Sequence, residues 1–238
     1  SDHRHAIREA RMPEFTVTPS ITSNPSGHAP LTAEIHFETS VGTTVTLLIS
    51  DGVILREVKF YTGGTQHNLP ILNLKPARCY KIEVMAVDAA DGTARAYLEL
   101  TTPALPADFP PLEVRQCQAR RREPGVILFP IGRGTRAVTS EPEAEFIVAL
   151  DSAGEVVWFY RSEYSLMDVR RLCSGNLIMM TTADRILEIN MLGRTVNAWC
   201  AGATAENGET AVDTHGFHHA LYELPNGNIA ALSHEARH

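Results

Sequence analysis

The sequence predicts an all-β protein in two parts, an immunoglobulin- or fibronectin-like β-sandwich followed by the first two to three blades of a β-propeller. Three observations predict this fold: short alternating runs of apolar and polar residues before residue 103, a proline-rich stretch after it, and repeated strand and turn patterns from residue 125 onward. The predicted parts are a tail at 1–12, a sandwich at 13–103, a linker at 104–124 and a partial propeller at 125–238.

The composition is that of a globular protein with an acidic balance. The chain has 238 residues, of which 44% are hydrophobic and 21% charged, so it is long enough for one large or two ordinary cores. Its net charge of −7 argues against general binding to nucleic acid or to an anionic membrane, because both need a basic surface. No apolar stretch has the length of a membrane helix or the pattern of a signal peptide, so we expect a soluble form, compatible with removal of a signal.

The sequence predicts neither a metal nor a cofactor. Its four cysteines, Cys79, Cys117, Cys173 and Cys200, are widely separated and form no CxxC pair, so a structural zinc site is unsupported and buried free thiols are expected. The Gly132-Arg133-Gly134 stretch resembles a phosphate loop only superficially, because no helix follows it to supply amide groups.

The first part of the chain contains β-type runs at regular intervals. They cover residues 15–18, 31–39, 43–49, 54–60, 80–88 and 93–101, with turn residues such as Asp91-Gly92 between them. Six or seven strands in about ninety residues are typical of a β-sandwich. This part carries no cluster of nucleophile, base or metal ligands, which favours a spacer or packing module.

A linker is predicted from its prolines. Residues 103–124 contain Pro103, Pro106, Pro110, Pro111 and Pro124, and prolines at that density interrupt the hydrogen-bond ladder of a sheet. An extended, semi-rigid connection between two domains fits this composition better than a loop within one core.

The second part repeats its own pattern. Its predicted strands cover residues 125–131, 145–150, 155–160, 167–172, 177–181, 185–189 and 194–199, and a further hairpin follows between residues 216 and 233. Aligning Gly154 with Gly193, and Gly175 with Gly227, gives offsets of about 40 and 52 residues. A four-strand unit of that period is typical of a propeller blade.

Residues 125–238 have room for two blades and the first two strands of a third, whereas a closed propeller has at least about four blades. A partial propeller exposes edges and faces that neighbouring blades should bury. We therefore expect the chain to be a fragment or a truncated product of a longer protein.

The strongest candidates for chemistry are two adjacent histidines, His218 and His219. They stand at the start of a predicted inner strand, residues 220–224, and Asp168 and Arg170 occupy similar places one repeat earlier. Imidazoles at the mouth of a propeller channel can serve as general acid or base, bind an anion or ligate a metal. The alternative is a pair of loop histidines that cap strand ends. Further candidates of weaker spacing are His215, His234, His238, Asp213 and Glu235.

Three stretches resemble one family. NPSGHAPLTAEIHF (24–37) resembles the opening of the N-terminal β-domain of bacterial aryl-sulfate sulfotransferases. LDSAGEVVWFYR (150–161) and GFHHALYELPNGNIAALS (216–233) are similar to blade repeats of that family's propeller, which is six-bladed. The resemblance covers nearly the whole chain after residue 12, with the domains in the same order.

The resemblance implies a periplasmic or secreted enzyme that moves a sulfuryl group from a phenolic sulfate ester to another phenol, independently of the nucleotide donor PAPS. In that family a histidine in the channel is transiently sulfated, and other histidines and an arginine hold the sulfate oxygens. By motif, His218 and His219 match a substrate-binding histidine, and Ala220 replaces the Asp that commonly follows. No residue here matches the nucleophile, which is expected downstream, so we expect residues 1–238 alone to be inactive.

The resemblance implies no cofactor and no nucleic-acid or membrane partner. It is compatible with a homodimer. The function of a different class that also fits the sequence is a non-catalytic secreted propeller that binds a ligand or a partner, with His218 and His219 structural. Sulfuryl transfer between a phenolic sulfate and a phenol separates the two.

Overall fold

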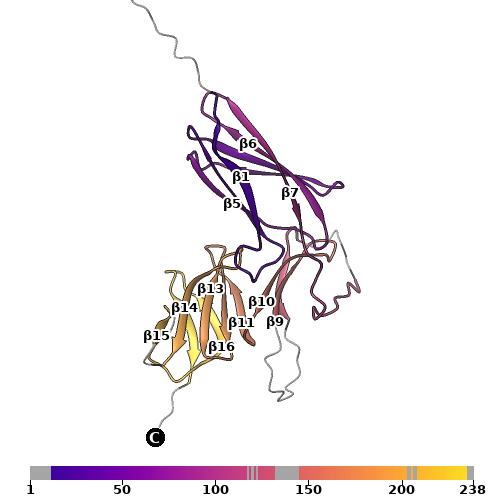
Figure 1. The fold of residues 1–238 in the computed structure, drawn as a ribbon. Helices are drawn as coiled ribbons and strands as arrows, with labels where there is room; N and C mark the ends of the chain where they lie inside the picture. The colour runs from indigo at the N-terminus through magenta and orange to yellow at the C-terminus, as the bar shows by residue number, and fades with distance from the viewer. Residues whose placement is uncertain are drawn as a thin grey trace, which may run out of the picture. The chain divides into compact units, whose positions relative to one another are not determined.

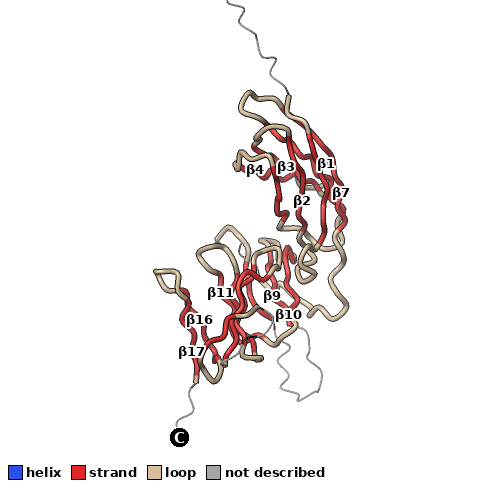
Figure 2. Tube along the Cα trace, turned by 60° about the vertical axis from the view of Figure 1, so that its left-hand side comes forward, coloured by secondary structure: helices blue, strands red, loops and turns tan. Residues whose placement is uncertain are grey.

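The computed structural model describes residues 12–116, 118, 121, 123–131, 145–202, 205 and 208–234 (Figures 1 and 2). Residues 1–11 of the predicted tail, Gly132-Arg133-Gly134 and Cys117 lie outside this range. The described residues form seventeen strands and contain no helix long and apolar enough to cross a membrane. This confirms the predicted all-β fold.

The chain divides into two compact units, each described by itself. Unit 1 comprises Ser1–Ser23, Ala33–Ile71 and Ala77–Thr102. Unit 2 comprises Asn24–Thr32, Leu72–Pro76 and Pro103–His238. Two short segments from the first third of the chain are therefore grouped with the C-terminal strands.

Unit 1 is a β-sandwich of seven antiparallel strands. They are β1 (Phe15–Ser23), β2 (Ala33–Thr39), β3 (Thr44–Ser50), β4 (Leu55–Phe60), β5 (Gln66–Ile71), β6 (Cys79–Val87) and β7 (Thr93–Thr101). One sheet has the order β1-β2-β5 and the other β4-β3-β6-β7. Apolar side chains alternate along β2, β3 and β6, which turns one face of each sheet toward a common core.

Strand β5 was not among the runs predicted from the sequence. Its buried positions are His67, Leu69 and Ile71, so a polar residue occupies one place of the apolar alternation. Pro70 also disfavours a strand, but β5 is an edge strand, where a missing N–H is tolerated. His67 fits the core because its ring stacks on Phe37, with ring centroids 4.6 Å apart, and its Nε2 lies 3.0 Å from the Thr43 hydroxyl.

Unit 2 contains three successive sheets with the strand pattern of propeller blades (Figure 1). Blade one is β8 (Ile127–Ile131), β9 (Glu145–Leu150) and β10 (Val156–Ser162). Blade two is β11 (Leu166–Arg171), β12 (Leu177–Thr181), β13 (Arg185–Ile189), β14 (Thr195–Ala201) and β15 (Thr210–Val212). The third sheet is the hairpin of β16 (Phe217–Glu223) and β17 (Ile229–Ser233). Strand β15, which pairs parallel to β14, was not predicted, and β16 begins three residues earlier than expected.

Four hairpin turns of unit 2 repeat one hydrogen-bond pattern. In each, the residue before the turn donates its N–H to a carbonyl four residues on and accepts from a glycine three residues on, as with Leu172, Asn176 and Gly175. The same pattern recurs at Asp151, Asn190 and Leu224. The glycines of the four turns have φ between 81° and 89°, a conformation that favours glycine. The repeat seen in the sequence is therefore a repeat of turn geometry.

Strand β12 is buried on both of its faces. Leu177 and Met179 join a core with residues of blade one, among them Ile147 and Trp158. Ile178 and Met180 point the other way and join a core with Phe217 and Leu221 of β16, against which Ile229 and Ala231 of β17 also pack. Because side chains alternate along a strand, one apolar sequence supplies two interfaces between sheets.

Two aromatic contacts secure blade one. The indole Nε1 of Trp158 donates a hydrogen bond of 2.8 Å to the carbonyl of Met191, in the β13–β14 turn. Phe109, in the proline-rich stretch, packs its ring against Phe146 and Phe159, with ring centroids 5.1 and 5.4 Å away. The described part of residues 104–124 contains no strand, and its first half is anchored on this sheet.

Truncation of a β12 side chain tests the double burial. Ile178 is 1% exposed and Ile127, on β8, is 60% exposed. We expect Ile178→Ala to lower the free energy of unfolding of unit 2 by about 2–5 kcal/mol. Ile127→Ala, which removes the same atoms, should change it by about 0.5 kcal/mol or less. Urea unfolding followed by tryptophan fluorescence measures this, since both tryptophans lie in unit 2. Equal losses for the two variants would contradict the assignment.

His67 makes the stability of unit 1 depend on pH. Burial lowers the pKa of His67 below its ordinary value of about 6.5. The unfolded chain therefore binds the proton more readily, and the free energy of unfolding should fall as the pH drops from about 6.5 through the folded-state pKa. His67→Phe should flatten this dependence. Urea unfolding followed by amide NMR signals of unit 1 checks it, and equal pH slopes for both proteins would refute it.

Candidate functional site

The two predicted histidines lie inside β16, in a bulge. Phe217 pairs with Ser233 and Leu221 with Ala231, and the register shifts between these two pairs. His219 has a φ of 60°, which is uncommon for a residue other than glycine. The sequence placed His218 and His219 just before the strand. The structure places both within its first residues, because the bulge is part of the strand.

The structure adds a third imidazole to this pair. The ring of His218 stands edge-on to that of His219, with centroids 4.0 Å apart, and edge-on to that of His234, at 6.1 Å. His234 follows β17 directly, so the pairing of Phe217 with Ser233 brings it to the bulge. All three side chains are exposed, and His218 and His234 border one shallow depression with Leu232 and Ser233. A ligand can therefore reach them.

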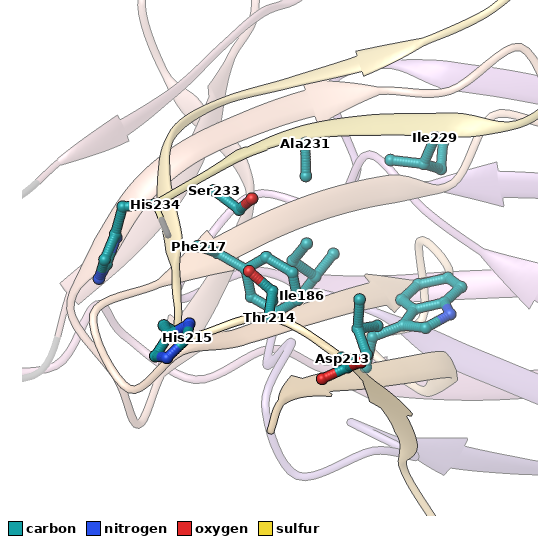
Figure 3. Close-up of a pocket in the computed structure, with 11 residues that line it drawn as sticks. Ile186, Asp213, Thr214, His215, Phe217, Ile229, Ala231, Ser233 and His234 are labelled. Atoms are coloured by element: carbon teal, nitrogen blue, oxygen red, sulfur yellow. The ribbon is translucent and has the colours of Figure 1, made fainter. Parts of the chain in front are cut away.

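A larger cavity, of about 610 Å³, lies between β13–β15 and the β16–β17 hairpin. Figure 3 shows His215 and His234 at one end of it and Ile229 at the other. Apolar side chains such as Trp199 and Phe217 line much of the wall, and Asp213 and Thr214 add polar groups. His234 borders both this cavity and the depression at His218.

Two carboxylates of blade two flank the bulge. Asp168, which the sequence placed in a position similar to the histidine pair, accepts a hydrogen bond of 2.9 Å from the Leu221 N–H at Oδ2. Asp184 accepts one of 3.1 Å from the Phe217 N–H at Oδ1. Arg170 donates its Nε–H to Asp168, so its guanidinium is tied to that carboxylate. Asp184 is not marked by any sequence pattern, because it lies in an ordinary polar turn.

The remaining candidates do not form a metal centre. Among the described residues, no three His, Cys, Asp or Glu side chains are placed to hold a metal ion. His215 lines the larger cavity, and Glu235 and His238 lie outside the described residues. Within the described part of the chain, Cys79, Cys173 and Cys200 form no disulfide with one another. Cys200 is buried, but Cys79 and Cys173 are exposed, so the expectation of buried thiols is wrong for these two.

Two models of protein families match this chain. Residues 113–238 match the model of Arylsulfotransferase (ASST), and residues 20–103 match that of the Arylsulfotransferase Ig-like domain. The chain belongs to the arylsulfotransferase family. This confirms the resemblance seen in the three sequence stretches, and the imidazole cluster lies within the first match. A search of curated proteins found no match.

A substitution at Gly216 tests how closely the groups around the bulge are packed. A Cβ on Gly216 would lie 2.8 Å from Asp184 Oδ1 and 2.8 Å from His234 Cε1. Both are ends of side chains, so we expect Gly216→Ala to displace them and to lower the free energy of unfolding by only about 1–2 kcal/mol. The imidazole NMR signals of His234 should shift.

Gly64→Ala is the matched control, because a Cβ there meets only ordinary contacts, the nearest at 3.7 Å. It should leave the His234 signals in place. Unshifted His234 signals in folded Gly216→Ala protein would show that the close approach at Gly216 is wrong.

Proposed function

We propose that this arylsulfotransferase takes part in sulfuryl transfer from a phenolic sulfate ester to another phenol, and that the His218–His219 pair supplies a histidine that contacts the sulfuryl group. The observation that carries the proposal is the exposed imidazole cluster within the segment that matches the family. An imidazole offers an N–H donor in either protonation state, so it suits the oxygens of a sulfuryl group.

The proposed reaction has two steps. A histidine nitrogen attacks sulfur, the bond from sulfur to the ester oxygen breaks, and the donor leaves as a phenol after it takes up a proton. The acceptor phenol then attacks the same sulfur while losing its proton, and the nitrogen–sulfur bond of the sulfohistidine breaks. We assign the nucleophile to a histidine outside residues 1–238. Since the donor is itself a phenolic ester, no PAPS is needed, which is compatible with a periplasmic or extracellular location.

Geometry favours His218 over His219 as the residue that contacts sulfur-bound oxygens. His218 stands between His219 and His234 and borders the depression that His234 also lines. Two imidazoles that border one depression can together donate hydrogen bonds to two oxygens of the same sulfuryl group.

The test is transfer from 4-nitrophenyl sulfate to phenol. The protein is produced with every residue that its gene encodes, and both released nitrophenolate and phenyl sulfate are measured. We expect transfer, and we expect His218→Gln to reduce kcat/KM by about a hundredfold, the scale of losing one donor to the transition state. Residues 1–238 alone should show no turnover.

His36→Gln is the control, since His36 is an exposed histidine of unit 1 that contacts Asn68. It should transfer at the wild-type rate. A folded full protein without transfer would favour a ligand-binding propeller instead. Unchanged kcat/KM in both His218→Gln and His219→Gln would refute the site, and turnover by residues 1–238 would refute the assignment of the nucleophile.

A further inference from the structure

We propose that Asp168 and Asp184 are positioning residues, which set the shape of the β16 bulge and so the orientation of His218 and His219. The catalytic part of this inference rests on the proposed function. The geometric part stands alone, on contacts between blade two and the backbone on either side of the imidazole pair.

The bulge needs partners from outside its own hairpin. The shift of register between Phe217 and Leu221 interrupts the ladder with β17, and buried N–H groups must find acceptors elsewhere. The left-handed backbone of His219 adds strain, and such a conformation persists only where the surroundings fix it. Both requirements point to contacts at the two ends of the bulge.

Asp168 and Asp184 supply those contacts at the two ends. Asp184 receives the Phe217 N–H at 3.1 Å, and Asp168 receives the Leu221 N–H at 2.9 Å. Phe217 and Leu221 are themselves buried in the core shared with β12. The residues between them, including both histidines, are thus held at both ends while their side chains face solvent.

The Asp168 carboxylate is itself held firmly. Its side chain is only 14% exposed, its Oδ1 accepts the Val169 N–H at 2.9 Å, and its Oδ2 accepts the Nε–H of Arg170 at 3.0 Å. A carboxylate fixed in this way forms a stronger hydrogen bond than a neutral acceptor. Its hydrogen bond with the Leu221 N–H can therefore fix the position of β16 relative to β11.

A third contact between the same sheets provides an internal control. Glu223, at the end of β16, accepts the Cys173 N–H at 2.7 Å, so it also ties the hairpin to blade two. It lies beyond Leu221, away from the bulge. Glu223→Ala therefore removes a contact of the same kind without touching the ends of the bulge.

The experiment compares four variants by NMR of the imidazole groups and by sulfuryl transfer from 4-nitrophenyl sulfate to phenol. We expect Asp168→Ala and Asp184→Ala to shift or broaden the His218 and His219 signals and to reduce kcat by about tenfold, with little change in KM. Asp168→Asn keeps an oxygen acceptor for the Leu221 N–H and should restore the signals and most of kcat. Glu223→Ala should leave the signals of both imidazoles in place.

The outcomes separate the two proposals. Unmoved imidazole signals in Asp168→Ala and Asp184→Ala, or equal movement in Glu223→Ala, would overturn the positioning role whatever the activity. If the wild-type protein transfers no sulfuryl group but the signals respond as expected, the proposed function fails and the positioning role stands. If neither alanine variant folds, the two carboxylates are structural and the inference is wrong.

Discussion

Burial of β12 on both faces is the constraint on which the second unit depends. Its side chains alternate between the core of blade one and the core of β16, so the three sheets share one strand as their common support. Close packing leaves such a strand little freedom to shift, because a displacement toward one core opens a void in the other. The place of β16, and of the imidazoles on it, therefore follows from the packing of Ile178 and Met180 against Phe217 and Leu221.

Much of the fold could be predicted from the sequence because its signals are local. The bounds of β12 and β13 match the predicted runs, since a glycine turn with positive φ precedes β12 and another follows β13. Strand β5 was missed because His67 occupies a core position that only the stacking on Phe37 and the contact with Thr43 explain. Strand β15 has three residues and a parallel partner, and so short a run carries no pattern of its own.

The candidate site was predictable only in part. His218 and His219 stand out because they are adjacent, and alignment of the repeats drew attention to Asp168. The approach of His234 depends on the register of β17, and the role of Asp184 depends on a turn that reaches a strand 33 residues later in the chain. A bulge and its side-chain partners are features of tertiary structure, which residue types and spacing along one strand do not encode.

The two faces of the β16–β17 hairpin explain why blade two has to position the imidazoles. One face packs Phe217, Leu221 and neighbouring residues on β12, whereas on the other face Tyr222 is 66% and Leu232 57% exposed. A two-stranded hairpin has little stability of its own in water. Among the described contacts, the shared core holds the hairpin against blade two. Apolar packing is non-directional, however, so it does not fix how the hairpin is rotated on that core. Directional bonds must set its rotation and the shape of its bulge, and Asp168 and Asp184 form those bonds beside the histidines.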